Sequence, residues 1–519
     1  MLQQLPWLSL LIWLPLLGAV LVLFTGGDKQ AKHARSIAIA FTILNLVISI
    51  PLCLGFDASR YDMQFTENVL WITAYQIHYA LGIDGISLVM VLLTNFTSLL
   101  VVIAGCHSIK TRVAQYMAAF LVMQSMIIGV FCAMDAILFY VFWEGMLIPM
   151  YLSIGMWGSA NRSYASIKFF LFTFFGSILM LVGLIYLYNI TGSFMIQHYY
   201  GLPLDLTTQK WLFFAFLFAF AVKVPMWPVH TWLPDAHTEA PAGGSVVLAA
   251  LMLKLGIYGF LRFSMPITPD ACIAMADFMV VLSLIAVIYI GMIAIVQTDM
   301  KKLIAYSSIA HMGFATLGCF MVYDIVGSIG SLQDAYMSLE GAVIQMVAHA
   351  FGSGAMFLGV GMLADRFYNH SRLIKDYGGV ANTMPVFAAF FMLFAMSNVG
   401  LPGTAGFVGE FMIIMSAFQS HFLIALFASL TLILSASYTL WMVKRIFFGP
   451  VANDHVAAFK DISGAEMTNY ILLTIGVFAL GLYPEPIVHV LRVTIGHLLL
   501  QSIPSQLVAS AGSSSLLYL

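Results

Sequence analysis

Seven titratable side chains stand inside long apolar runs, where such groups are rare. They are Glu144, Lys223, Lys254 and Glu410, together with His230, His311 and His349. A charge at the centre of a bilayer costs on the order of a few kcal/mol or more, so these residues are candidates for function. Burial favours the neutral form of a lysine, whereas a nearby carboxylate favours its ammonium form. Shifting one group against the other would load or release a proton, so these residue types predict proton transfer.

The order of the side chains along the apolar runs predicts a relay. Glu144 and Lys223 would load the proton, and Lys254 would be the central group. Glu410 would be the last protonatable site before the outside. The three histidines would act as bridging groups, because histidine titrates near neutral pH.

Each residue also has a purely structural interpretation. Glu144 and Lys223 could form a static ion pair that fixes helix register. Glu410 could cap a half-helix N-terminus, and the histidines could join helices by hydrogen bonds. Asp135 lies at a span boundary, where a solvated or capping carboxylate is common. We expect the functional role for the buried charges, and we leave it open for the histidines.

A metal site has little support in the sequence. His230 and His237 with Asp235 and Glu239 could provide ligands, but their spacing matches no standard site. His237 is expected to be structural.

The composition sets the environment of these residues. Of 519 residues, 61% are apolar and only 8% are charged, whereas a soluble domain has roughly a quarter charged residues. The apolar runs are continuous rather than alternating, which predicts membrane-spanning helices in a lipid bilayer and not a barrel. The net charge of −2 gives no indication of nucleic-acid binding.

At about 20 residues per crossing, the chain predicts an all-α polytopic membrane protein with about fourteen transmembrane helices. The run from Trp7 to Phe24 lacks a basic segment before it and a cleavage site, so it is expected to be a retained span. The expected spans lie near residues 5–24, 34–55, 85–106, 115–134, 136–157, 166–190, 211–228, 243–263, 271–297, 302–322, 340–363, 385–417, 421–447 and 468–483.

The basic residues orient these spans. With the N-terminus outside, most lysines and arginines, including Lys301, fall in the inner loops. The outer side holds only Arg60, Lys210, Arg262 and Arg492. This asymmetry follows the positive-inside rule, so both termini are expected outside.

Two of the spans are expected to be broken. In the seventh, FAFAVKVPMWPVHTWLPDAH, Pro225 and Pro228 open the helix beside Lys223. In the twelfth, AMSNVGLPGTAGFVGE, Gly400 and Gly403 flank Pro402 just before Glu410. Unwound backbone at this depth is typical of the ion pathways of transporters.

The breaks fall at the fourth position of two successive five-helix blocks. Five is odd, so the second block enters the membrane from the opposite side, which predicts two inverted repeats. The expected division is 1–114 for helices 1–3, 115–263 for the first repeat, 270–447 for the second repeat, and 448–519 for helix 14 and a tail. The tail after Pro484, which ends in GSSSLLYL, has no interpretation from its sequence.

No redox or nucleotide motif is present in the sequence. The five cysteines form no CxxC pair and no cluster sequence, and neither a Walker loop nor a GxGxxG after a strand occurs. We therefore expect no cofactor in this chain.

Several motifs together resemble the antiporter-like subunit family of respiratory complex I, the NADH:quinone oxidoreductase. The most specific is KVPMWPVHTWLPDAHTEAPAGGSVVLAALMLKLGIYGFLRF, from Lys223 to Phe263. FYVFWEGMLIPMYL around Glu144, IAYSSIAHMGF around His311 and LPGTAGFVGEF around Glu410 also match. The resemblance covers essentially the whole chain. Most members carry lysine where Glu410 stands, and one branch has a long C-terminal lateral helix that is not expected here.

The resemblance implies a proton-translocating subunit with one proton channel and no redox centre of its own. It implies L-type and N-type antiporter-like neighbours in the membrane arm of a translocase. FMN, iron–sulfur clusters and the main quinone site would belong to partner subunits. The location implied is a bacterial inner membrane, with both termini on the periplasmic side.

Three other functions stay open. The chain could belong to a multisubunit sodium/proton antiporter or to a membrane-bound hydrogenase. A structural spacer, in which buried charges only hold helices together, is the third possibility.

Overall fold

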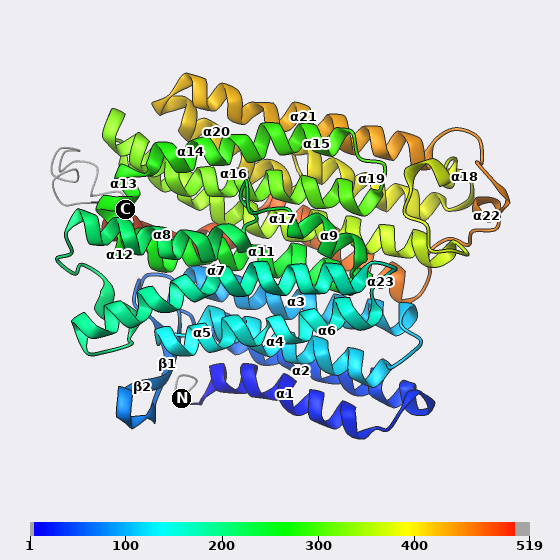
Figure 1. The fold of residues 1–519 in the computed structure, drawn as a ribbon. Helices are drawn as coiled ribbons and strands as arrows, with labels where there is room; N and C mark the ends of the chain where they lie inside the picture. The colour runs from blue at the N-terminus through cyan, green and yellow to red at the C-terminus, as the bar shows by residue number, and fades with distance from the viewer. Residues whose placement is uncertain (1–4, 504–519) are drawn as a thin grey trace.

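The protein is a bundle of long helices that run side by side (Figure 1). A computed structural model describes residues 5–503. Within that range, twelve helical segments are long and apolar enough to cross a membrane. Two further spans are interrupted and consist of two helices each, α8 (Leu206–Lys223) with α9 (Trp232–Glu239), and α19 (Pro385–Val399) with α20 (Ala405–Ser420). The prediction of an all-α polytopic membrane protein with about fourteen spans is confirmed.

The other helices have the following bounds. The first half contains α1 (Trp7–Phe24), α2 (Ala31–Gly55), α3 (Gly85–Ser108), α4 (Val113–Cys132), α5 (Ala136–Gly145), α6 (Leu147–Trp157), α7 (Arg162–Thr191), α10 (Ala242–Val247), α11 (Leu253–Gly259) and α12 (Met265–Ile267). The second half contains α13 (Pro269–Ala274), α14 (Ala276–Ile285), α15 (Gly291–Ile295), α16 (Met300–Ile329), α17 (Leu332–Arg366), α18 (Val380–Thr383), α21 (Phe422–Phe447), α22 (Asp454–Ala457), α23 (Ala465–Leu482) and α24 (Glu485–Ser502). Three π-helical turns join some of these into continuous spans, η5 (Leu248–Met252), η6 (Phe260–Ser264) and η7 (Ala286–Ile290).

The two expected helix breaks are present. Between α8 and α9, the indole of Trp232 donates to the carbonyl of Val222 at 2.9 Å, which satisfies a group at the broken end. Between α19 and α20, Gly400 and Gly403 have φ values of +83° and +88°, a region that residues with a Cβ rarely adopt. The Thr404 hydroxyl stabilises this turn by donating a hydrogen bond to the carbonyl of Leu401 at 2.7 Å.

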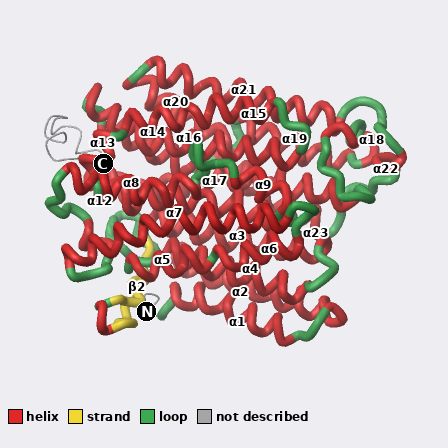
Figure 2. Tube along the Cα trace, viewed as in Figure 1, coloured by secondary structure: helices red, strands yellow, loops and turns green. Residues whose placement is uncertain are grey.

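A two-stranded hairpin and one helix were not predicted. Strands β1 (Gln64–Ile72) and β2 (Ile77–Ile83) form an antiparallel hairpin (Figure 2). Helix α24 continues the chain beyond Pro484 and packs against α3, α12 and α17. Polar residues interrupt its apolar pattern, and its Thr494 hydroxyl accepts a hydrogen bond from the Gly85 amide at 3.0 Å. The serine-rich end of the tail lies outside the described residues.

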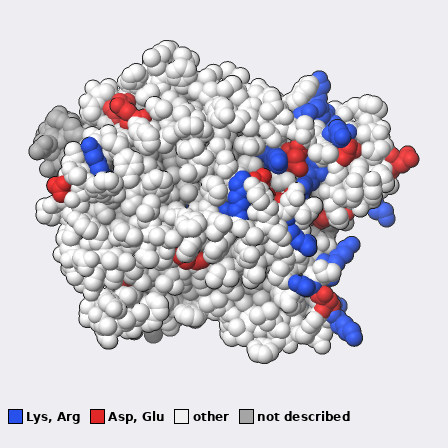
Figure 3. Space-filling model, viewed as in Figure 1, with Lys and Arg blue, Asp and Glu red and all other residues white. Residues whose placement is uncertain are grey.

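The charges of the bundle are distributed unevenly. Lysines and arginines gather at one end, which we call the basic end (Figure 3). At the opposite end, helix α1 begins near the hairpin (Figure 1). Asp135 is buried and caps α5, accepting hydrogen bonds from the amides of Ile137 and Leu138 at 2.9 and 3.1 Å. Its capping role is confirmed, whereas the solvated interpretation is wrong.

We expect Asp84→Ala to destabilise the fold. The Asp84 carboxylate forms an ion pair with Arg262, and the two side chains are only 3% and 14% exposed. The guanidinium also donates to the hydroxyls of Tyr258 and Ser87, each at 3.1 Å. Removing one partner of a buried pair leaves an uncompensated charge and costs about 3–5 kcal/mol. The melting temperature of the purified protein in detergent measures this loss.

Asp62→Ala is the matched control. Asp62 pairs with Arg60 at 2.5 Å, but both side chains are about half exposed. An exposed pair contributes at most about 1 kcal/mol. Equal melting temperatures for the two variants would contradict the assignment of the Asp84 pair as a structural anchor.

Candidate functional site

Four of the predicted residues lie in one row across four spans. The Lys254 Nζ on α11 is 2.7 Å from the His349 Nδ1 on α17. The His349 and His311 rings have centroids 5.7 Å apart. The His311 Nδ1 on α16 is 3.0 Å from the Glu410 Oε1 on α20. We call Lys254, His349, His311 and Glu410 the central row.

A π-helical turn positions the lysine of this row. Lys254 follows η5, and its Nζ donates to the carbonyl of Ala249 within that turn. π turns inside α-helices occur frequently at functional sites, because they displace the regular hydrogen-bond pattern. The ammonium group therefore has two acceptors in a fully buried position, one on its own helix and one on α17.

Glu410 contacts other helices rather than the start of its own. Besides the His311 contact, its Oε1 accepts a hydrogen bond from the Gln345 Nε2 at 3.1 Å. A Cβ on Gly400 would come within 2.7 Å of the Glu410 Oε2, so the glycine leaves room for the carboxylate. No described hydrogen bond joins this carboxylate to the N-terminal amides of α20, as capping would require. The capping interpretation is therefore unsupported.

Glu144 and Lys223 form a second, separate unit. The Glu144 carboxylate, at the end of α5, accepts a hydrogen bond from the Ser177 hydroxyl on α7. The Lys223 Nζ lies 5.1 Å from the centre of the Trp143 ring, and no hydrogen-bond partner for it is present among the described residues. Glu144 and Lys223 interact electrostatically but make no direct ion-pair contact within residues 5–503. The structure does not contain the static ion pair of the structural interpretation.

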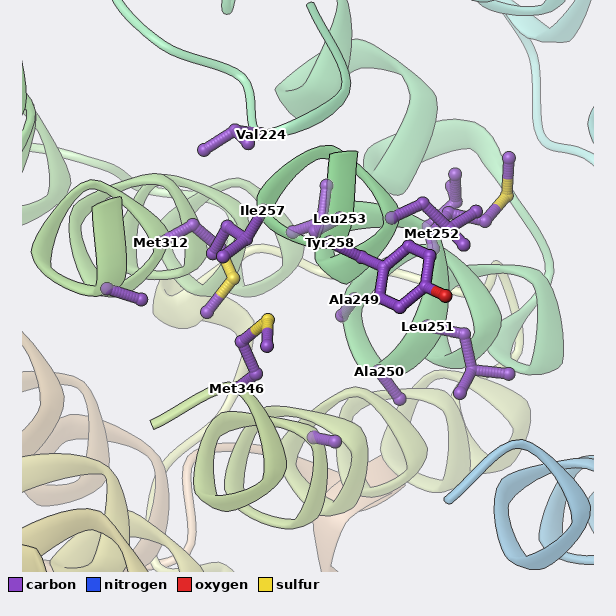
Figure 4. Packing of buried hydrophobic residues seen from close by; sticks show 14 of the residues in the cluster. Val224, Ala249, Ala250, Leu251, Met252, Leu253, Ile257, Tyr258, Met312 and Met346 are labelled. Atoms are coloured by element: carbon purple, nitrogen blue, oxygen red, sulfur yellow. The ribbon is translucent and has the colours of Figure 1, made fainter. Parts of the chain in front are cut away.

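Apolar side chains surround these polar groups. Leu253 and Ile257 lie on the helix of Lys254, Val224 lies against it, and Met312 and Met346 point toward each other beside it (Figure 4). All five are buried. Such surroundings have a low dielectric constant, which strengthens the interaction between neighbouring charges. A change of charge on one residue of the central row therefore alters the electrostatic energy of the next residue.

The remaining histidines do not join the central row directly. His230 lies in the break between α8 and α9, and its Nδ1 has no hydrogen-bond partner among the described residues. His237 is on α9, and its ring stacks on that of Phe357 with centroids 4.4 Å apart. Asp235 instead pairs with Lys168 at 2.7 Å, and Glu239 pairs with Arg372 at 3.7 Å. No group of three potential metal ligands converges within residues 5–503.

Four residues of this region were not predicted from the sequence. Gln345 and Ser353 lie four residues before and after His349, so helical spacing could have placed them on its face of α17. Ser177 had no local signal. Lys301, expected in an inner loop, begins α16 at the basic end and is only 5% exposed.

Gln345→Ala is expected to slow proton pumping by roughly tenfold, because a hydrogen bond to a charged group contributes about 1.5–3 kcal/mol. The variant leaves the Glu410 carboxylate with only the His311 contact. Proton uptake by sealed membrane vesicles measures the effect. Gln297→Ala is the control, since the one described hydrogen bond of the Gln297 side chain goes to the carbonyl of Ile293 at the end of the neighbouring helix α15. Unchanged pumping in Gln345→Ala would exclude a role for this amide.

Comparisons with known proteins place the chain in a family. The family model described as "NADH:quinone oxidoreductase/Mrp antiporter, TM" matches residues 133–435, a range that includes all seven predicted site residues. NADH-quinone oxidoreductase subunit M of Rhodobacter capsulatus is 44% identical over 508 residues, covering 95% of this chain and 96% of that protein. NADH-ubiquinone oxidoreductase chain 4 of Marchantia polymorpha is 40% identical over 492 residues, covering 95% and 96%.

Solved structures share the fold. A chain of respiratory complex I from Thermus thermophilus superposes with a TM-score of 0.85 at 26% identity, covering 96% of this chain and all of that one. A chain of the Mrp complex from Dietzia sp. DQ12-45-1b gives a TM-score of 0.79 at 20% identity, covering 98% and 99%. The relatives match along nearly their whole length and include the site. The chain belongs to the family of NADH-quinone oxidoreductase subunit M.

Proposed function

We propose that this chain is a proton-translocating membrane subunit of NADH-quinone oxidoreductase. Protons would pass through its buried relay, driven by quinone reduction in other subunits. The observation that carries this proposal is the central row, in which a lysine, two histidines and a glutamate from four spans lie next to one another in space. His311 and His349 each have a ring nitrogen, Nε2, without a hydrogen-bond partner among the described residues.

Proton movement along the row needs only small shifts of side chains. The ammonium of Lys254 can give a proton to the His349 Nδ1 along the 2.7 Å contact. At the other end, the His311 Nδ1 can give a proton to the Glu410 carboxylate along the 3.0 Å contact. The free Nε2 atoms of the two rings supply the donor and the acceptor for the step between them. Each transfer relocates one charge, and each imidazole must then return to its starting tautomer before it accepts the next proton.

Glu144 and Lys223 would load the relay. Because the two groups interact electrostatically without direct contact, a small movement of either one changes their attraction substantially in apolar surroundings. Ser177 would hold the carboxylate in its separated position. His230, in the helix break next to Lys223, would support the transfer toward Lys254.

The inverted repeats would explain why Lys223 and Glu410 each lie next to a helix break. The proposed repeats are residues 115–263 and 270–447, with α8–α9 broken in the first and α19–α20 in the second. Lys223 ends α8, and Glu410 lies in the second turn of α20. The two half-channels would then meet at Lys254.

We place the subunit in a bacterial inner membrane with both termini on the periplasmic side. The concentration of lysines and arginines at the basic end supports this orientation. L-type and N-type antiporter-like subunits would be its neighbours in the membrane arm. FMN, iron–sulfur clusters and quinone would be bound by partner subunits.

A sodium/proton antiporter subunit is the alternative that the shared fold with the Mrp complex favours. The purified assembly, reconstituted in proteoliposomes, separates the two functions. We expect proton uptake that requires NADH and quinone and persists without sodium. Transport that depends on sodium and shows no quinone-linked activity would overturn the proposal.

A further inference from the structure

A cavity of about 430 Å³ lies at the basic end, where three segments of the second half of the chain meet. The segments are the residues that follow α15, the turn η8 (Ile374–Asp376) with its neighbours, and the last turn of α21. Two cations, Lys375 and Arg445, line the cavity together with Thr298 and Tyr377. Among residues 5–503, no acidic side chain lines it. The cavity is therefore positively charged and lacks a described counter-charge.

Arg445 has donor capacity that the described part of the chain does not use. Its Nε donates to the carbonyl of Trp441 at 3.3 Å, and its guanidinium lies 5.2 Å from the centre of the Trp441 ring. The Nη2 atom is buried and has no hydrogen-bond partner among the described residues. A buried charged donor without an acceptor costs more than a neutral one. An anion in the cavity would supply the missing acceptor.

The acidic side chains nearest in sequence are already occupied. The Asp376 carboxylate, next to Lys375, accepts a hydrogen bond from the Ser371 hydroxyl. The Asp299 carboxylate, next to Thr298, pairs with Arg372 at 3.3 Å. The counter-charge for Lys375 and Arg445 is therefore expected to come from another molecule.

An exposed apolar strip on α21 leads to this cavity. Leu426, Ile433 and Trp441 lie on the exposed surface of the helix, and Lys444 and Arg445 follow in its last turn. Tryptophan followed by basic residues is typical of a helix that leaves the hydrocarbon region and enters the headgroup region. The strip therefore places the cavity at the level of lipid headgroups.

Helix α15 provides a second strip beside the first. Met292 and Val296 are 49% and 72% exposed, and Thr298 of the cavity follows two residues after Val296. The two helices lie side by side (Figure 1), and a Cβ on Gly291 would come within 3.1 Å of the Leu434 side chain. The glycine thus lets α15 approach α21 closely. Two apolar strips on adjacent helices end at one positively charged cavity.

We propose that this cavity binds the phosphate headgroup of an anionic phospholipid, whose acyl chains lie along α15 and α21. The Lys375 ammonium and the Arg445 guanidinium donate to the phosphate oxygens, and charge-assisted hydrogen bonds of this kind are the stronger ones. Basic pockets between membrane helices on the cytoplasmic side are suited to such headgroups. A zwitterionic lipid fits less well, because it brings its own cation toward the same two side chains. The bound lipid joins the end of α21 to the segment between α17 and α19.

Photolabelling of the assembled complex tests this site. The probe is phosphatidylglycerol with a diazirine on one acyl chain, and the same diazirine on phosphatidylcholine is the comparison. After illumination, mass spectrometry of peptides measures the labelling of the ends of α15 and α21. We expect phosphatidylglycerol to label them roughly tenfold more than phosphatidylcholine.

Neutralising the two cations identifies the headgroup site. Arg445→Gln combined with Lys375→Gln is expected to reduce labelling by phosphatidylglycerol to the level of phosphatidylcholine. Lys32→Gln combined with Lys460→Gln removes two exposed lysines of the basic end outside the cavity and is the matched control. We expect the control to keep full labelling.

Four results would overturn the proposal. Equal labelling by the two probes would mean ordinary lipid contact, and absence of labelling would mean that a neighbouring subunit covers the strips. Loss of labelling in excess inorganic phosphate would assign the cavity to a free anion. Unchanged labelling in the double variant would exclude the two cations. Should that variant fail to assemble, Lys375→Gln alone decides, with a roughly fivefold loss expected and unchanged labelling as the contradiction.

Discussion

A complex carrying Lys223→Ala is expected to assemble normally and to lose proton pumping by about a hundredfold or more. The Lys223 Nζ has no described hydrogen-bond partner, so the substitution leaves no acceptor unsatisfied. Its loss removes the cation that interacts with Glu144. Proton uptake by inverted membrane vesicles, normalised to the amount of assembled complex, measures the effect.

Lys210→Ala is the matched control for this variant. Lys210 lies on the same helix, α8, but near the opposite end and only half-buried. Glu144→Ala should lose pumping as Lys223→Ala does, since the two form one loading unit. Wild-type pumping in both would support the structural spacer and contradict the relay.

Lys254→Met is expected to abolish pumping to a similar extent, about a hundredfold or more. Among the described residues of the central row, only Lys254 contacts the His349 Nδ1 and can transfer a proton to it. Methionine fills a similar volume, so packing is largely preserved. The same vesicle assay, with quinone reduction followed in parallel, measures the loss.

Lys254→Arg makes the second test sharper. A guanidinium keeps the positive charge and the hydrogen bonds, but it is not deprotonated in proteins. If the charge alone mattered, Lys254→Arg would pump. We expect it to fail like Lys254→Met, whereas the exposed Lys444→Met on α21 should pump normally. Pumping by Lys254→Arg would contradict proton transfer through this residue.

The fold was largely predictable because lipid imposes a simple rule on the chain. Each crossing needs a long apolar helix, and the spans follow that rule from Trp7 to Leu482. The breaks were predictable because Pro225 and Pro228 lack a backbone donor and Gly400 adopts a positive φ. Helix α24 was missed because its polar residues, such as Glu485 and Arg492, interrupt the apolar pattern.

The pairing of side chains was less predictable. Lys254 and His349 are 95 residues apart, and only tertiary packing of η5, just before Lys254, on α17 brings them together. The sequence suggested a close Glu144–Lys223 partnership, but Ser177 binds the carboxylate instead. Ser177 and Lys301 gave no signal, since a serine in a helix and a lysine near a loop are ordinary in sequence. Their contacts depend on which segments of the folded chain pack against them.

A cryo-electron microscopy map of the assembled complex that resolves ordered water shows whether a hydrated path links the buried residues. We expect water molecules to join Glu144 and Lys223 to Lys254, and His349 and His311 to Glu410, in at least one captured state. A dry wall of packed apolar side chains between Lys223 and Lys254 in every state would exclude proton transfer along this path.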